Sequence, residues 1–176
     1  MKKLLFAISL LFVSLPASAG TEELQHKRLL NVVESLGVQV AINDSYCKKL
    51  NMFNGFYINK KKQLYICQDN SLMDGKIVEW TENDFDTIRH ETFHLIQDCN
   101  DGKLGDGDYK LVYNDDELIQ VVLDSGITMK RLQRYVNLYT ILGESSHGTM
   151  LEMEAISSSK VMSADDITEK IIDVCV

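Results

Sequence analysis

The pentapeptide His90-Glu91-Thr92-Phe93-His94 carries two histidines and a glutamate at a spacing that suits metal binding and proton transfer. On a helix, residues four apart lie one turn apart on the same face, so the two imidazoles point the same way. They can fill two corners of a tetrahedral zinc site. Glu91 is rotated by one residue and need not touch the metal. Its carboxylate can instead take a proton from a water at the open corner, whose pKa zinc lowers.

A third ligand is needed, because two imidazoles leave a zinc site incomplete. The metzincin pattern H-E-x-x-H-x-x-G-x-x-H would supply it from the same segment, but Gln97 and Asn100 occupy the glycine and final histidine positions. Only two further histidines exist in the chain. A carboxylate is therefore the better expectation, and residues 151–158 form about two turns of predicted helix that carry Glu152 and Glu154.

The stretch Glu154–Ser158 resembles the N-E-A-x-S-D segment of the thermolysin-like gluzincins, in which the glutamate is the third zinc ligand. Met153 stands in place of the asparagine, and Ser158 stands in place of the aspartate. In that family the aspartate supports a zinc histidine through a hydrogen bond. Asp98, one turn after His94, is the candidate for that role here. The resemblance covers only the two motif helices and the hairpin before them.

The resemblance implies zinc-dependent hydrolysis of a peptide bond in a peptide or protein substrate. Zinc is then held by His90, His94 and Glu154, while Glu91 is the general base and later the proton donor. Glu152 is the competing third ligand, and it points to the other side of the same helix. Two other interpretations stay open. One is a non-catalytic binding or inhibitory protein with a zincin-like scaffold, and the other is a motif that arose by chance on an ordinary helix.

Three weaker features lie outside the motif. His147, in a loop bounded by glycines, could donate a hydrogen bond to the oxyanion formed during peptide attack, or it could be a plain surface residue. Asp101, Asp106 and Asp108 lack the EF-hand spacing, so a solvated acidic loop is favoured over a calcium site. The predicted strand Gly55–Ile58 could be the edge that pairs with an extended substrate, as in zincins generally.

The elements that must position these residues indicate an α+β fold, with a small N-terminal β-sheet and hairpin followed by a helical, zincin-like half. Thr81 is the expected N-cap of the motif helix, with Asp84 as its capping acid. Gly126 is expected to kink or divide a long helical pattern. We expect helices over 24–36, 81–99, 114–142, 149–162 and 163–175, and strands over 38–42, 55–58 and 63–67.

The four cysteines predict two disulfides, for which three pairings are possible. We favour Cys47–Cys67, which would staple the hairpin region, and Cys99–Cys175, which would tie the C-terminal helix to the end of the motif helix. A zinc site made of the four cysteines is disfavoured, because the chain has no C-x-x-C spacing.

The first nineteen residues predict export. Lys2 and Lys3 precede an apolar run, and Ala17-Ser18-Ala19 gives the small-x-small pattern of a cleavage site. We therefore expect a signal peptide over 1–19 and a single metallopeptidase-like domain over 20–176, secreted or periplasmic. No later stretch is apolar enough to span a bilayer, so no membrane association is expected after cleavage. The net charge of −8 argues against nucleic acid as a partner.

Overall fold

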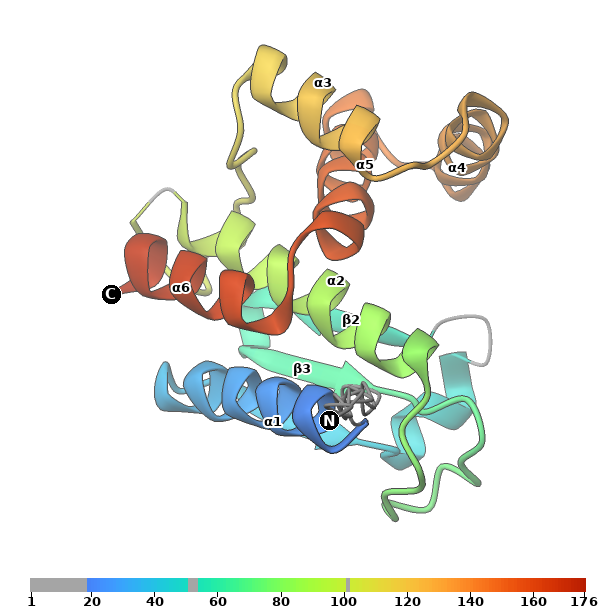
Figure 1. Ribbon diagram of the computed structural model, residues 1–176, viewed down its shortest axis with the longest axis vertical. Coiled ribbons are helices and arrows are strands. Elements are labelled where there is room, and N and C mark those ends of the chain that lie inside the picture. The colour runs from blue at the N-terminus through green and yellow to red at the C-terminus, as the bar shows by residue number, and fades with distance from the viewer. Residues whose placement is uncertain (1–18, 51–53, 101) are drawn as a thin grey trace, which may run out of the picture.

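A small mixed sheet forms the N-terminal part of the fold (Figure 1). Its strands are β1 (Gln39–Ile42), β2 (Gly55–Ile58) and β3 (Gln63–Ile66), in the order β1-β3-β2. β2 and β3 form an antiparallel hairpin, and β1 runs parallel to β3. This order leaves β2 at one edge of the sheet that the described residues form. The predicted hairpin and first strand are thus confirmed.

The structure is a computed structural model, and it describes residues 19–50, 54–100 and 102–176. Nearly all of the predicted signal peptide over 1–19 lies outside the described residues, as does Asp101 of the acidic loop. Within the described part of the chain, no helix combines the length and the apolar character needed to cross a membrane.

The inner face of the sheet packs against two helices, α1 (Ala19–Ser35) and α2 (Glu82–Cys99). Strand residues alternate between the two faces, so buried Leu64 and Ile66 point inward with Tyr57, which pairs with Leu64. α6 (Ala164–Cys175) packs against both helices. These elements share one apolar core, and we call them the body. Its fully buried large apolar side chains are Leu29, Leu64, Ile66, Ile88, Phe93, Leu95, Ile96, Ile167 and Ile171.

Polar side chains set the ends of the body helices as the sequence predicted. Thr81 caps α2 by accepting from the backbone N–H of Asp84, whose carboxylate accepts from the N–H of Thr81 in return. Ser163 and Asp166 form the same capping box at the start of α6. Such caps satisfy backbone donors that a helix leaves unpaired, each contributing about 1 kcal/mol.

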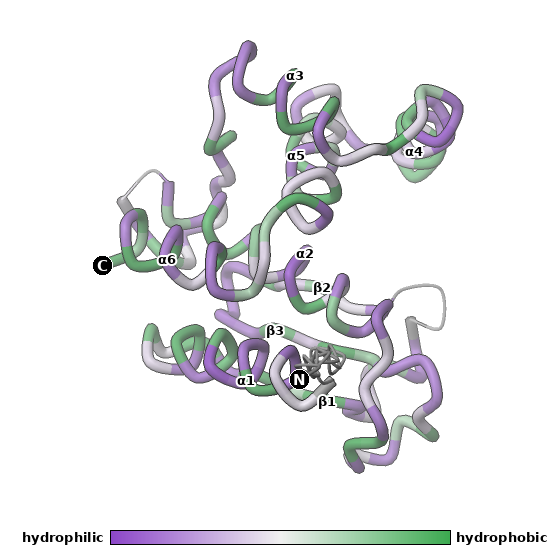
Figure 2. The backbone as a smooth tube through the Cα atoms, viewed as in Figure 1, coloured by the Kyte–Doolittle hydropathy of each residue, from purple (hydrophilic) through white to green (hydrophobic). Residues whose placement is uncertain are grey.

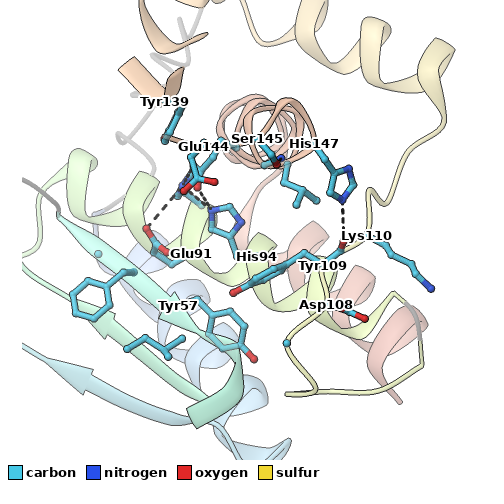
Figure 3. A pocket seen from close by; sticks show the side chains of 18 of the residues that line it. Tyr57, Glu91, His94, Asp108, Tyr109, Lys110, Tyr139, Glu144, Ser145 and His147 are labelled. Atoms are coloured by element: carbon cyan, nitrogen blue, oxygen red, sulfur yellow. Dashed lines mark hydrogen bonds and ion pairs between the residues drawn. The ribbon is translucent and has the colours of Figure 1, made fainter. Parts of the chain in front are cut away.

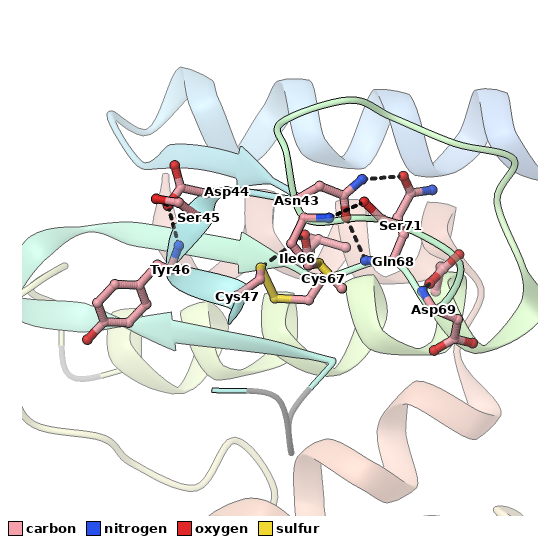
Figure 4. Close-up of a disulfide and its surroundings, with 12 residues drawn as sticks. Asn43, Asp44, Ser45, Tyr46, Cys47, Ile66, Cys67, Gln68, Asp69 and Ser71 are labelled. Atoms are coloured by element: carbon pink, nitrogen blue, oxygen red, sulfur yellow. Dashed lines mark hydrogen bonds between the residues drawn. A yellow bond between two sulfur atoms is a disulfide. The ribbon is translucent and has the colours of Figure 1, made fainter. Parts of the chain in front are cut away.

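Two disulfides fasten the body, and both predicted pairings are confirmed. Cys99–Cys175 joins the last residue of α2 to the last residue of α6. Cys47–Cys67 joins the short 3-10 helix η1 (Ser45–Leu50) to the end of β3 (Figure 4). A second short 3-10 helix, η2 (Asn59–Lys61), forms the hairpin turn.

Three further helices lie above the body in Figure 1, and we call them the arm: α3 (Asp115–Asp124), α4 (Met129–Leu142) and α5 (Ser146–Val161). The long pattern predicted over 114–142 is divided, with Gly126 at φ 66° between α3 and α4. α5 packs on α2, and α3 and α4 each pack on α5. Apolar segments run along the outside of the arm (Figure 2), where Ile119, Leu123 and Ile141 are exposed.

The start of α5 differs from the prediction. Ser145 caps this helix by accepting from the N–H of Gly148, so α5 begins three residues before the predicted Thr149. His147 therefore lies in the first turn of α5 and not in a loop. The serine cap outweighs the glycine at position 148, which had indicated a loop in the sequence.

Candidate metal centre

The two histidines of α2 point at one another across a single turn of helix. Their Nε2 atoms are 3.2 Å apart, and their rings are nearly perpendicular, at 86°. Two nitrogen ligands, each about 2.0–2.1 Å from one tetrahedral zinc, are separated by about 3.3 Å. The pair is therefore spaced as two ligands of one ion would be. With Glu91 added, the ligand atoms of His90, Glu91 and His94 all lie within 4.8 Å of one another, a cluster that could hold a metal.

A hydrogen-bond chain fixes the tautomer of His94. The side-chain nitrogen of Gln97 donates to the carbonyl of Leu151 and to a carboxylate oxygen of Glu154, each at 2.8 Å. These two acceptors orient the amide, so that its oxygen faces Nδ1 of His94 at 2.7 Å. Nδ1 must then be the protonated nitrogen in the neutral ring. The lone pair of Nε2 is left to face His90 and the centre of the cluster.

The structure brings Glu152 to the histidines, and not the predicted ligand Glu154. The two carboxylate oxygens of Glu152 each lie 3.5 Å from an imidazole, one from Nε2 of His90 and the other from Nε2 of His94. Residues two apart on a helix point about 200° apart, so only one of the two glutamates can face α2 at this place. The packing of α5 on α2 selects Glu152.

Glu154 is instead buried in the joint between the body and the arm. One of its carboxylate oxygens accepts from the backbone N–H groups of Val112 and Tyr113, both at 2.8 Å. The other accepts from Gln97, the residue that orients His94. This corrects the assignment of Glu154 as third ligand, because both oxygens are engaged away from the imidazoles. Glu154 is a positioning residue that acts on His94 through Gln97.

Asp98, the candidate support for a zinc histidine, contacts other partners in the structure. Its carboxylate accepts from the Tyr57 hydroxyl at 2.7 Å and from the backbone N–H of Gly105 at 2.9 Å. It thereby joins α2 to the edge strand and to the loop after α2. The support of His94 falls to Gln97, one position earlier in the chain.

Glu91 lies beside the imidazoles, with a carboxylate oxygen 3.9 Å from Nε2 of His90. Burial raises the pKa of Glu91, and the neighbouring histidines act against that rise. Gly55 of β2 makes room for it, since a Cβ there would lie 2.6 Å from Cγ2 of Thr87 and 2.9 Å from Cγ of Glu91. A larger residue at this position of β2 would push α2 away from the sheet.

The charges around the two imidazoles favour a cation between them. Burial disfavours the charged form of His94, but the Glu152 carboxylate outweighs it and raises the pKa of His94 to about 9. Burial also disfavours the charged form of Glu152, but the two histidines lower its pKa well below the ordinary range. A divalent cation bound by the deprotonated ligands would take the place of the protons on the imidazoles. It would be attracted by the same negative charge of Glu152.

A cleft of about 980 Å³ opens beside the cluster (Figure 3). Edge strand β2 lines one side, and the start of α5 lines another. Tyr139 of α4 reaches in from the arm, where its hydroxyl donates to Glu152; burial is the main cause of its raised pKa. His147 lies at the other end, with Nε2 3.1 Å from the carbonyl of Tyr109. The sequence pointed to neither Tyr139 nor Gln97, because their roles depend on contacts between distant helices.

The predicted acidic loop lies against the turn of the hairpin, η2. The side chains of Lys60 and Lys62 lie against Gly107 and Gly105. The Asp106 carboxylate accepts from a backbone N–H within the loop. Among the described residues, which leave out Asp101, this loop gathers no cluster of ligand atoms that could hold a metal.

One family of proteins matches residues 21–136, which is more than half of the chain, and it is described as a domain of unknown function, DUF8637. The chain belongs to this family. The matched segment of the DUF8637 domain includes most of α1, the sheet and all of α2, and it ends within α4. His90, Glu91 and His94 are thus inside the match, whereas Glu152 lies beyond it. No curated protein and no solved structure matches the chain.

Proposed function

We propose that this protein is a zinc-dependent peptidase. The observation that carries the proposal is the convergence of three groups on one point of the cleft. The Nε2 atoms of His90 and His94 are 3.2 Å apart, and the Glu152 carboxylate lies 3.5 Å from each. Two imidazoles and one carboxylate, with a fourth position open to the cleft, form the ligand set of a catalytic zinc site.

The proposed ligands are His90 and His94 from the body and Glu152 from the arm. Bound there, zinc would supply a Lewis acid and a water of lowered pKa. Gln97 keeps the lone pair of His94 directed at the site. Tyr139 holds Glu152 from the side of the arm. Each residue of this set has a defined task and a defined element that places it.

Glu91 is the proposed general base. Its buried carboxylate takes the proton of the attacking water and returns it to the nitrogen of the departing amine. Burial raises its pKa and so brings it closer to neutral pH, where a group can both accept and release a proton. A residue that served only to fill the core would not need this charge next to the imidazoles.

The proposed substrate is an extended peptide. β2 lies at the edge of the sheet that the described residues form and lines the cleft, so the edge of this strand faces the space beside the proposed metal ligands. A peptide can add to such an edge as a further strand, which holds its backbone in place for hydrolysis. The two disulfides are compatible with a secreted protein, and we propose a secreted or periplasmic location.

Glu91→Gln tests the proposal. We expect the zinc-loaded parent protein to cleave members of a mixed peptide library, and the variant to cleave them about 10²–10⁴ times more slowly. The variant should bind as much zinc as the parent, measured by metal analysis. Glu144→Gln, which changes another glutamate of the cleft wall, is the matched control and should keep its activity. Equal cleavage by parent and Glu91→Gln would exclude Glu91 as the base. Zinc binding without any cleavage would favour a binding or inhibitory protein.

A further inference from the structure

Three aromatic rings form a cluster on the outer face of the sheet, next to the cleft. The centroids of Phe56 and Tyr65 are 4.5 Å apart, with the rings stacked at 18°. Tyr46 lies 5.5 Å from Phe56 and 5.4 Å from Tyr65, which closes a triangle of rings. All three side chains are partly exposed. Phe56 and Tyr46 line the same cleft as His90 and Glu91.

The pleat of β2 explains why these rings do not belong to the core. Gly55 and Tyr57 point inward, since Gly55 lies against Glu91 and the Tyr57 hydroxyl donates to Asp98. Phe56 and Ile58 must then point to the opposite, outer face. Helices α1 and α2 pack on the inner face. The ring cluster therefore stays available to a molecule that lies along the edge of β2.

A peptide added to β2 would meet this cluster at a fixed register. Residues paired across two strands point to the same face, with Cβ atoms about 4.5–5.5 Å apart. The peptide residue paired with Phe56 would thus project its side chain onto the outer face, against the rings of Phe56 and Tyr46. Aromatic and β-branched side chains are the best cross-strand neighbours of an aromatic ring, and aromatic pairs gain further from stacking.

We propose that Tyr46, Phe56 and Tyr65 form a specificity subsite for an aromatic side chain of an extended peptide substrate, with β-branched side chains second. This inference rests on the proposed function, because it assumes that a peptide binds along β2. It adds the substrate class: peptides with a large, flat apolar residue at the one position that pairs with Phe56.

The test compares peptides that differ at a single position. Zinc-loaded parent protein is given a library in which one residue near the scissile bond is varied in turn among Phe, Tyr, Val, Ala and Asp. We expect kcat/KM to favour Phe or Tyr over Ala by about three- to tenfold at one position only. Phe56→Ala should lose this preference, so that its kcat/KM for the Phe and Ala peptides becomes nearly equal. Phe56→Tyr should keep the preference, and Tyr46→Ala should reduce it.

The outcomes separate this inference from the proposed function. Cleavage without preference, or with a preference that Phe56→Ala leaves unchanged, would overturn the subsite and leave the peptidase intact. If the parent cleaves no peptide, the proposed hydrolysis is rejected, and a measurement of peptide binding tests the subsite instead. Fluorescence anisotropy would then compare a labelled extended peptide that contains Phe with its Ala counterpart. Equal binding of both peptides to the parent, or an unchanged difference in Phe56→Ala, would also overturn the inference. Melting curves and zinc content verify that each variant is folded.

Discussion

The body and the arm hold the candidate site in different ways. α2 of the body is fixed by the sheet, by α1 and α6, and by the disulfide at its last residue. The arm helix α3 buries Leu118 and α4 buries Leu132, while several of their larger apolar residues stay exposed. Yet the arm supplies Glu152 and Tyr139. The imidazoles are thus built into the part of the fold with the larger apolar core, and the carboxylate is brought by a part with less core of its own.

The largest expected effect comes from removing the arm's contribution to the metal. Glu152→Ala should weaken zinc binding strongly, because two imidazoles alone leave the ion with too few ligands. Glu154→Gln should have the smaller effect of disturbing an outer partner, about 10–100-fold in affinity. Competition with a chelating dye would measure both. A greater loss in Glu154→Gln than in Glu152→Ala would return the third ligand to Glu154.

Zinc should stabilise the arm more than the body, because the proposed ion joins Glu152 to α2. At a free zinc concentration 100 times the dissociation constant, the folded protein should gain about 2.7 kcal/mol. Hydrogen exchange with and without zinc would locate this gain, and we expect increased protection in α4 and α5. His94→Ala, which removes one ligand, is the control and should show no change on addition of zinc. Uniform protection across body and arm would show that the arm is already as firmly held as the body.

The smallest expected effect concerns His26, a buried histidine of α1 that contacts Arg89 of α2. Burial lowers the pKa of His26, and the nearby Arg89 acts in the same direction, while Glu22 opposes both. Its Nε2 lies 3.1 Å from a guanidinium nitrogen of Arg89, which can only donate, so the ring is neutral. As the pH falls below about 6.5, the unfolded chain takes up a proton at this position before the folded chain does. The free energy of unfolding should therefore decrease from there down to the folded pKa.

Urea denaturation of the metal-free protein between pH 7.5 and pH 5 would measure this dependence. His26→Gln removes the titrating group and should flatten the curve by at most about 1.4 kcal/mol per pH unit relative to the parent. Parallel curves for the two proteins would mean that His26 is protonated equally in the folded and unfolded states. The network around Arg89 would then have to be reconsidered.

The sequence predicted those parts of the molecule that depend on local chemistry. Thr81 and Ser163 marked two helix starts, because a capping side chain needs only its own next turn. The hairpin and the pair of histidines also followed from spacing. Of three possible disulfide pairings, the favoured one is confirmed, but it rested on the elements that it would join and not on spacing. The identity of the carboxylate beside the two imidazoles did not follow from spacing. Glu152 and Glu154 are equally helical, and only the rotation of α5 against α2 decides which one reaches the imidazoles.

Other parts of the site were hidden for the same reason. In the sequence, Tyr139 is one of many residues of a predicted helix. Its sequence neighbours do not indicate that α4 reaches the cleft. In the sequence, Gln97 only showed that the metzincin pattern is not met. In the structure, its side chain contacts Nδ1 of His94 and orients that ring. Side chains that act across two helices leave no periodic signal along one of them.

The disulfide between Cys99 and Cys175 makes the arm part of a covalent ring. It joins residues 76 apart, and the ring includes every residue of α3, α4 and α5. If a protease cut an exposed loop of the arm once, such as the one around Gly126, the two fragments would stay linked. Glu152 would remain tethered to the end of the helix that bears both histidines. A chain exposed to such cleavage would keep the parts of the candidate metal site together until the disulfide was reduced.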